Sequence, residues 1–353
     1  MRRPRIGVIG AGSWAVSAHL PGIVARRDEV DLVAMSGAEQ HIQTISDRFE
    51  CPLASGDYED VLAAQCDAIV VSSPGGVHAL HAGRALQAGA HVLCEKPMTL
   101  DPGDAWRLVD EAGTSERHLL VSFGWNFMPI VRGAVRLMRE VGIGSIEQMS
   151  ISMSSQTREL LLNAGAYPDA SPESIPEQRT WTDPRLSGGG YGQAQLSHAL
   201  GLALSLVDEP VRDVFAWMAT PQPEGVELHD AIALRFANGA VGTVSGGSAH
   251  LGANANKHHL AVRGIGSRGQ FLVDVDREAV VVFAEGKDHT LESPLGAGAY
   301  VPAGPVNGLM DLVLGRTEDN PAPGYLGART VGVLDAAYRS RELGEPVRCY
   351  GRW

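Results

Sequence analysis

The stretch RIGVIGAGSWA, residues 5–15, joins a short apolar run to a glycine-rich turn. Gly10, Gly12 and Ala15 fit the pattern G-x-G-x-x-A, and residues 17–27 after it are predicted to form a helix. In such a unit the first glycine permits a tight turn, the second lets the backbone approach a pyrophosphate, and the alanine lets the helix pack on the strand. The stretch therefore predicts a dinucleotide-binding site, with a purely structural glycine turn as the alternative.

Strand and helix patterns alternate from this turn to about residue 123. The apolar runs lie at residues 30–35, 66–74, 90–97 and 118–127, and helical patterns at 41–49, 58–65, 77–89 and 101–116 lie between them. This alternation indicates a doubly wound parallel α/β sheet. Strand patterns dominate from residue 145 to 286, and the 353-residue length exceeds that of a usual single core. We therefore expect two domains, residues 1–123 and 124–353.

Composition excludes several classes of function. A net charge of −12 argues against a nucleic-acid or anionic-membrane partner, and no apolar run reaches the roughly 18 residues of a membrane span. The four cysteines are not in C-x-x-C spacing, which predicts free thiols in the cytoplasm. His258 and His259 would point to opposite faces of a strand, so no metal site is expected there.

The end of the second strand bears on the choice of cofactor. An acid there would bind the ribose hydroxyls of NAD, but this strand ends in Ser36 and Gly37. Nothing at that position repels a 2′-phosphate, and His41 and Arg48 are the nearest basic residues. The sequence leaves NAD and NADP open and slightly favours NADP.

Residues 91–100, HVLCEKPMTL, place Glu95-Lys96-Pro97 at the end of a buried strand. Ligands of parallel α/β sheets bind outside the carboxyl ends of the strands, so Lys96 is expected to project into the cofactor crevice. A positively charged nicotinamide would lower the pKa of Lys96, which suits proton transfer to a substrate oxygen. The alternative is a solvated lysine in a turn.

These motifs, with SSPGGVHALHAGRALQAGAHVLCEKPMTL at residues 72–100 and GGGYGQAQLSHAL at 188–200, resemble the Gfo/Idh/MocA family. The resemblance covers nearly the whole chain. It implies a Rossmann domain, followed by an α+β domain with a large, mostly antiparallel open sheet. It also implies hydride transfer between NAD(P) and a hydroxyl carbon of a sugar, sugar derivative or cyclitol, in a homodimer or homotetramer.

The resemblance also assigns roles to residues. Lys96 is implied as the active-site lysine, and Ser73, Pro74 and His78 as the loop and helix under the nicotinamide. Trp125 and Asn126 fall at the domain junction, although Trp125 could equally be core packing. The full set expected at the cofactor is Gly10, Gly12, Ser13, Trp14, Ser36, Ser73, Pro74, His78, Glu95, Lys96 and Trp125.

The second family motif is altered in this chain. Its usual form is three glycines, three residues, then D-x-G-x-H; here Gly188–Gly190 and His198 are kept, but Ala194 stands for the Asp and Leu196 for the glycine. One reading keeps Lys96 and His198 as the proton-handling pair. Others are a redox-assisted elimination or hydrolysis with retained cofactor, and a non-catalytic nucleotide-dependent sensor. A buried histidine without a catalytic role is the alternative for His198.

Residues 157–187 form a long Pro- and Ser-rich segment just before the glycines. Long irregular segments in compact domains often line functional sites, so we expect a wall of the substrate pocket, with a surface excursion as the alternative. The residues expected at the substrate are Lys96, Trp125, Asn126, Arg158, Trp181, Tyr191, Gln195 and His198.

Overall fold

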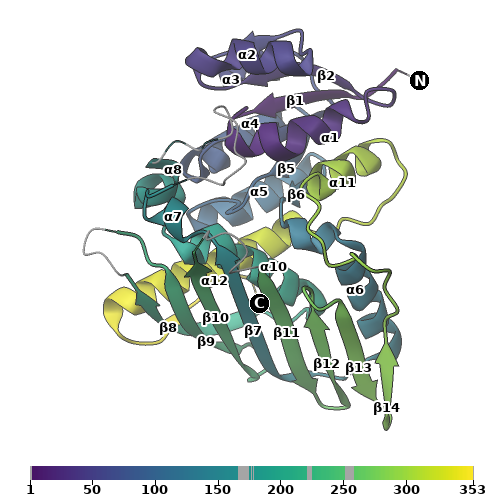
Figure 1. The fold of residues 1–353 in the computed structure, drawn as a ribbon, viewed down its shortest axis with the longest axis vertical. Coiled ribbons are helices and arrows are strands. Elements are labelled where there is room, and N and C mark those ends of the chain that lie inside the picture. The colour runs from purple at the N-terminus through teal and green to yellow at the C-terminus, as the bar shows by residue number, and fades with distance from the viewer. Residues whose placement is uncertain are drawn as a thin grey trace.

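The computed structural model describes residues 2–165, 175, 177, 179–220, 225–250 and 258–352. Two sheets organise the molecule, one built from the N-terminal third and one from the rest of the chain (Figure 1). Helices α10 and α12 lie between them. This mixed α/β architecture confirms the fold class expected from the sequence.

The first sheet has six parallel strands in the order β3-β2-β1-β4-β5-β6. This is the order of a dinucleotide-binding doubly wound sheet. The central strands are buried on both faces, which explains their continuous apolar runs. The strands are β1 (Arg5–Ile9), β2 (Asp31–Ser36), β3 (Ala54–Ser55), β4 (Ala68–Val71), β5 (His91–Cys94) and β6 (Leu119–Val121).

Short helices connect these strands. Asp57 and Asp101 begin α3 and α5 by accepting hydrogen bonds from the backbone N–H groups of Glu59 and Asp104. The helices are the π-helical turn η1 (Ala15–His19), α1 (Leu20–Val24), α2 (Glu39–Phe49), α3 (Tyr58–Ala63), the 3₁₀ turn η2 (Gly75–Val77), α4 (His78–Gln87) and α5 (Pro102–Thr114).

The predicted strand 118–127 is shorter than expected. It ends at Val121, and Gly124–Phe127 form a 3₁₀ turn, η3, that leads into α6 (Pro129–Val141). Gly124 has no room for a side chain because the ring of Tyr300 packs on it. The chain therefore turns out of the first sheet at this glycine.

The second sheet has nine strands in the order β14-β13-β12-β11-β7-β10-β9-β8-β15. Of these, β7 and β10 are parallel and the other neighbours are antiparallel, as the resemblance implied. The short edge strands β14 and β15 were not predicted. The strands are β7 (Ile146–Gln156), β8 (Val211–Ala219), β9 (His229–Phe236), β10 (Val241–Ala249), β11 (His259–Gly266), β12 (Gly269–Asp274), β13 (Ala279–Ala284), β14 (Lys287–Thr290) and β15 (Val347–Arg348).

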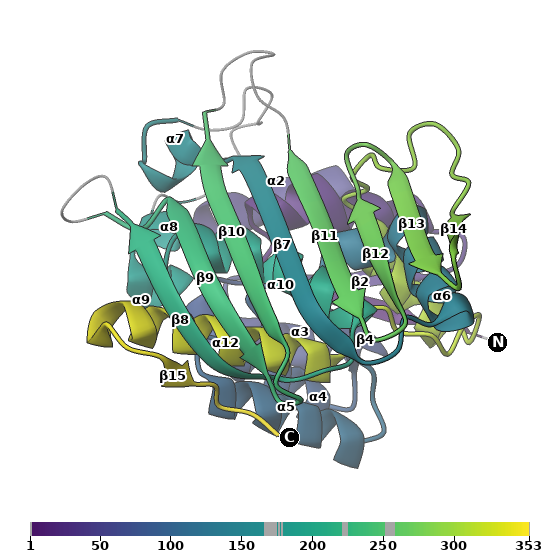
Figure 2. The same ribbon diagram turned by 90° about the horizontal axis from the view of Figure 1, so that it is seen from below.

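Helices cover one face of this sheet, and Figure 2 shows the other face in front. Residues alternate between buried and exposed along β9, as expected for a sheet packed on one side. The remaining helices are α7 (Arg158–Leu161), α8 (Arg179–Thr182), α9 (Pro184–Ser187), the π-helical turn η5 (Gly192–Leu196), α10 (Ser197–Leu206), α11 (Gly304–Val313) and α12 (Gly324–Leu343). None of the helices in the described part of the chain has both the length and the apolar character needed to cross a bilayer.

Helix α11 returns from the second part of the chain to the first sheet. Its residues Val306, Leu309 and Met310 share one buried cluster with Ile6 and Leu93 of that sheet. Figure 1 shows α11 beside β5 and β6. Residues 304–313, which the sequence places in the second domain, therefore complete the core of the first.

Candidate active site

The glycine turn after β1 has the geometry that a dinucleotide requires. Gly10 has φ +89°, and a side chain there would collide with the backbone of Ser72 and Ser73. Gly12 has nothing within 4 Å of the place a Cβ would occupy. The first glycine is thus needed for packing between loops, whereas the second leaves open space beside the start of a helix. These residues fit a pyrophosphate at Gly12.

Ser36 braces this turn rather than facing solvent. Its carbonyl oxygen accepts hydrogen bonds from the N–H groups of Gly10 (2.9 Å) and Ala11 (2.7 Å), and its side chain is buried. Nearby, Glu39 starts α2 and packs against Gly56. Sequence reasoning considered only the residues that directly end the strand and missed this exposed carboxylate.

Lys96 follows β5 at the carboxyl edge of the first sheet. Its Nζ donates a hydrogen bond of 2.7 Å to the carbonyl oxygen of Ala194 in η5. Burial lowers the pKa of the Lys96 ammonium, and the nearby Glu95 carboxylate opposes that shift. The lysine is therefore held between the two domains and is partly buried, not a solvated turn residue.

Glu95, which the resemblance places at the cofactor, is paired within the protein. Its Oε1 lies 2.8 Å from Nε2 of His19, and both side chains are buried. Burial alone would raise the pKa of Glu95, but the bonds and charges of His19, Lys96 and Ser122 outweigh burial and lower it to about 2. The carboxylate is thus used to fasten η1 to the end of β5.

His198 lies on α10, in the same electrostatic environment as Lys96. Burial lowers the pKa of its imidazole well below the usual value, and the charge of Lys96 lowers it further. Its Nδ1 has no hydrogen-bond partner among the described residues, although the side chain is buried. The structure therefore brings Lys96 and His198 together and keeps the imidazole neutral.

Two loops meet at His78, the first residue of α4. Its ring nitrogens lie 2.6 Å from the carbonyl oxygen of Ser73 and 2.8 Å from that of Pro97. His81, one turn later, has Nδ1 2.8 Å from the hydroxyl of Ser73. His78 itself is buried, so its ring is turned to the two loops and not to open space.

A row of rings runs from the glycine turn to the second sheet. The ring centroid of Tyr300 is 6.5 Å from that of Trp14 and 4.7 Å from that of Trp125. Trp125 is in turn 6.3 Å from His258 at the start of β11. Trp14 is 37% exposed, and Trp125 is buried. Tyr300 and His258 were missed by sequence reasoning because nothing local connects them to residues 14 and 125.

Asn126 and Tyr191 make buried hydrogen bonds within the fold, and the substrate role expected of each stays a prediction. The amide of Asn126 donates to the carbonyl oxygens of Gly201 (3.1 Å) and Pro321 (3.2 Å), in a buried position. The fully buried Tyr191 hydroxyl donates to the carbonyl oxygen of Met153 (3.3 Å) and lies 3.0 Å from the hydroxyl of Ser155. These polar groups join α10 and the segment before it to their neighbours.

The other expected substrate residues are more dispersed. Gln195 lies in η5 next to Ala194 and is 8% exposed. Trp181 is on α8 and packs partly on the core. Arg158 begins α7, and its charge adds to the effect of burial in lowering the pKa of His229. Within the described residues, no hydrogen bond, ion pair or ring contact joins Trp181 or Arg158 to Lys96 or His198. Residues 166–174, 176 and 178 of this segment lie outside the described part of the chain.

A buried acid holds the turn that carries Ala194. Glu227 accepts hydrogen bonds from the N–H groups of Gly190 (2.9 Å) and Gly192 (3.0 Å), and from the hydroxyl of Tyr338 (2.6 Å). Negative charge at this position also suits the N-terminal end of a helix. No sequence pattern links Glu227 to these partners, the farthest of which, Tyr338, lies 111 positions away from it.

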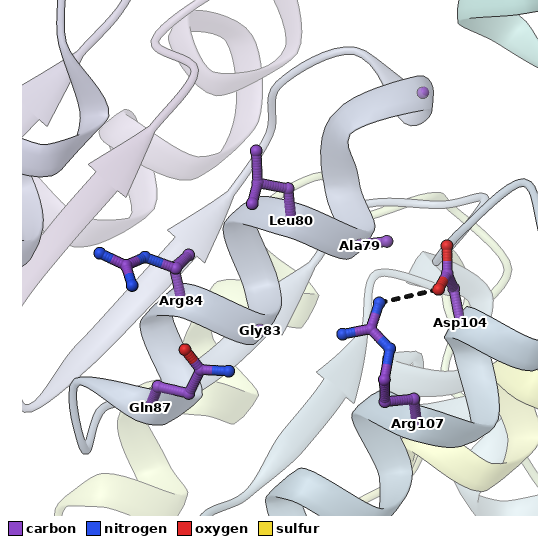
Figure 3. Close-up of a pocket in the computed structure, with 8 residues that line it drawn as sticks. Ala79, Leu80, Gly83, Arg84, Gln87, Asp104 and Arg107 are labelled. Carbon is purple, nitrogen blue, oxygen red and sulfur yellow. Dashed lines mark hydrogen bonds and ion pairs between the residues drawn. The ribbon is translucent and has the colours of Figure 1, made fainter.

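Two other features carry no expected site residue. A hollow of about 290 Å³ between α4 and α5 is lined by Arg84 and Arg107, and Arg107 pairs with Asp104 at 2.8 Å (Figure 3).

The side chains of His259, Asp274 and Asp276 form a second such feature, because the atoms with which they could bind a metal lie within 4.8 Å of one another. His259 Nδ1 bonds to Asp276 at 3.0 Å, and such groups are common without a metal, so we assign none.

Comparison with known proteins identifies both parts of the chain. The family profile described as "Oxidoreductase family, NAD-binding Rossmann fold" matches residues 4–123. The profile described as "GFO/IDH/MocA C-terminal domain" matches residues 134–272.

Among individual proteins, dTDP-3,4-didehydro-2,6-dideoxy-α-D-glucose 3-reductase of Saccharopolyspora spinosa is 28% identical over 99% of both chains. The enzyme named D-xylose 1-dehydrogenase (NADP(+)) 2 of Haloferax volcanii is 26% identical over 67% of each. A levoglucosan dehydrogenase in complex with NADH and L-sorbose superposes with a TM-score of 0.79 at 20% identity, over 100% of both chains. This last likeness shows the shared fold.

Proposed function

Since the chain belongs to the Gfo/Idh/MocA oxidoreductase family, with its NAD-binding Rossmann domain, we propose that Lys96 and His198 form its catalytic pair. The substrate proposed is a sugar, sugar derivative or cyclitol, oxidised or reduced at a hydroxyl carbon. The observation that supports this most is that Lys96, at the carboxyl edge of the first sheet, bonds to Ala194 of η5 and acts electrostatically on His198 of α10. A bound nicotinamide supplies the hydride chemistry.

The chain's own residues handle the hydroxyl proton. A lysine of lowered pKa gives up its proton more readily than an ordinary lysine, so its Nζ can accept a proton from a hydroxyl and return it. The carbonyl oxygen of Ala194 orients that nitrogen through their 2.7 Å hydrogen bond. His198 stays neutral and can donate or accept one hydrogen bond at the same oxygen.

Substrate chemistry is proposed from the relatives and the walls of the site. The two relatives named above carry the names of a dTDP-sugar reductase and a xylose dehydrogenase, so sugars and sugar nucleotides are the first candidates. The exposed part of the Trp14 ring and the half-buried Tyr300 ring beside it offer flat apolar surface of the kind that a sugar ring packs on. Gln195 is proposed as a partner of substrate hydroxyls.

The cofactor is NAD or NADP. The absence of an acid directly after β2 supports the slight preference for NADP, whereas the exposed Glu39 near Gly56 favours NAD. Parallel titrations of both cofactors by quenching of tryptophan fluorescence would decide between them.

Absorbance at 340 nm tests the proposed reaction. Purified protein is incubated with NAD or NADP and a panel of neutral sugars, cyclitols and sugar nucleotides, with Lys96→Met as the matched control. Substrate-dependent change in wild type and its loss in the variant support the proposal. Product formed without net cofactor change would indicate retained-cofactor elimination. Saturable ligand binding without product would indicate a sensor.

A homodimer or homotetramer is proposed through the uncovered face of the second sheet. Trp217, Val241, Ile265 and Phe283 are exposed there, at 39–68% of their surfaces. Monomeric proteins rarely leave such apolar side chains on one broad face. Light scattering after gel filtration should give a molar mass that is a multiple of 37.4 kDa, and Trp217→Glu should reduce that mass.

A cytoplasmic location is likewise proposed, supported by the four free cysteines.

A further inference from the structure

His78 lies between the two loops that flank the proposed site. One loop follows β4 and contains Ser73; the other follows β5 and contains Lys96 and Pro97. The His78 ring contacts the carbonyl oxygens of Ser73 (2.6 Å) and Pro97 (2.8 Å) and is 1% exposed. A single buried side chain therefore connects the residue directly after Lys96 to the neighbouring loop.

The loop at Lys96 has few other attachments. Pro97 has no N–H group and cannot extend the β5 ladder. The Lys96 N–H makes a 3.2 Å contact to the side chain of its own neighbour, Glu95. The Lys96 Nζ is held from the far side by the Ala194 carbonyl. On the near side, the carbonyl oxygen of Pro97 is held by His78.

We infer that His78 is a positioning residue for Lys96, not a cofactor contact as the sequence implied. By fixing the Pro97 carbonyl against the Ser73 carbonyl, its ring sets how deeply the lysine stem sits between the domains. A neutral imidazole with its proton on Nδ1 donates to the Pro97 carbonyl oxygen, and an imidazolium donates to both carbonyl oxygens, so either of these forms holds the Pro97 carbonyl. This inference concerns the proposed active site and rests on the role proposed for Lys96.

The charged groups around His78 agree with such a role. Burial lowers the pKa of the His78 ring, the two carbonyl contacts and the Glu95 carboxylate act in the opposite direction, and the Lys96 charge lowers it again. Glu95 is already bonded to His19. His81 is the neighbouring titratable group on α4. Among the described residues of the two loops, it bonds to the Ser73 hydroxyl and to no other group. The link from α4 to the Lys96 loop thus passes through His78.

Lysine side-chain NMR tests this directly, because the chain contains only three lysines, Lys96, Lys257 and Lys287. The protein is grown with ¹³C-lysine, the Cε signals are assigned with single Lys→Arg variants, and each ammonium is titrated. In wild type the pKa of Lys96 should lie below the ordinary value of about 10.4. In His78→Phe the loosened lysine gains water, and the pKa should rise by about one unit.

Two further variants complete the test. His81→Phe removes a ring contact to the same β4 loop but none to the Lys96 loop, so the pKa of Lys96 should stay at the wild-type value. His78→Gln keeps an amide donor and should give an intermediate shift; it also replaces His78→Phe if that variant does not fold. An unchanged Lys96 pKa in the folded His78 variants would overturn the inference, as would an equal shift in His81→Phe.

The NMR readout does not depend on knowing the substrate. If no sugar is turned over but the pKa of Lys96 moves as expected, the proposed reaction fails while the positioning role stands. Where turnover is measurable, His78→Phe should lower kcat about tenfold and leave the cofactor Kd within about threefold. Equal losses in kcat and cofactor affinity would point to general misfolding and would contradict the positioning role.

Discussion

The Nζ atom of Lys96 lies 2.7 Å from the main-chain oxygen of Ala194, a residue 98 positions later in the chain. A carbonyl oxygen orients an ammonium group but does not neutralise its charge as a carboxylate would. The lysine is therefore held in place while burial still lowers its pKa. The turn η5 is π-helical, a form that often marks functional sites.

Ala194→Asp should raise the pKa of Lys96, because it adds a negative charge beside the ammonium. The acid limb of the pH–rate profile should then move to higher pH. Ala194 is partly exposed, so the variant should fold. Ala194→Asn, which adds similar volume without charge, is the control and should leave the limb in place. An acid limb at the wild-type pH in the folded Asp variant would show that residue 194 does not face the lysine.

Lys96→Met should lower turnover by about 10²–10⁴-fold, the range for loss of a general acid–base group, with cofactor affinity kept within a few-fold. The methionine retains most of the buried stem. Lys287→Met, at an exposed position on β14, is the control. Single-turnover absorbance and a fluorescence titration measure the two quantities, and wild-type turnover in the variant would remove Lys96 from the mechanism.

Gly10→Ala should lower the thermal stability of the protein, whereas Gly12→Ala should weaken cofactor binding. A methyl group at residue 10 meets the backbone of Ser73 and must adopt φ +89°, so this variant should lose several degrees in Tm. A methyl group at residue 12 enters open space, so Tm should be kept while cofactor Kd rises at least about tenfold. Equal cofactor affinity in Gly12→Ala and wild type would place the pyrophosphate elsewhere.

Glu95→Gln should destabilise the protein in a pH-dependent way. The pKa of Glu95 is about 2 in the folded chain and near 4.5 without its partners, so the carboxylate contributes stability above pH 4.5. That contribution is lost as the pH falls from 4.5 toward 2. Thermal melts between pH 3 and pH 7 should show a Tm deficit in the variant that shrinks with acidification. A constant deficit would mean that the His19–Glu95 charge plays no part.

Asp230→Asn should stabilise the protein at neutral pH. Burial, reinforced by the Glu227 charge, raises the pKa of Asp230 to about 8, and neither carboxylate oxygen has a partner among the described residues. The folded state therefore holds a proton that the unfolded chain releases near pH 3.8, so wild-type stability falls as the pH rises from 4 to 8. The gain in the Asn variant should grow over that window. Urea unfolding at pH 5 and pH 8 measures it, and equal gains at both would contradict the raised pKa.

Helices and strands could be predicted well where the same kind of burial continues over several residues in a row or where a capping residue marks an end. The buried strands β4 and β5 read as unbroken apolar runs, and Asp101 signalled the start of α5. Side-chain partners were harder, because they depend on contacts between distant segments. Glu95 bonds to His19, 76 residues away, and Tyr191 bonds to Ser155 of β7, 36 residues away. Lys96 could be assigned to the candidate site because its neighbours form a motif, whereas no local pattern connects Tyr300 to that site.

The docking of α11 on the first sheet makes the nucleotide-binding half dependent on chain synthesised much later. Val306, Leu309 and Met310 cover apolar residues of that sheet, and Gly22 leaves room for Val306 and Ala303 against α1. A ribosome that has released only the first 123 residues presents a parallel sheet whose apolar contacts with α11 are missing. Folding of this half is therefore completed only after residue 313 has emerged, and a fragment ending at residue 123 would need an α11 peptide added in trans to become a stable, soluble unit.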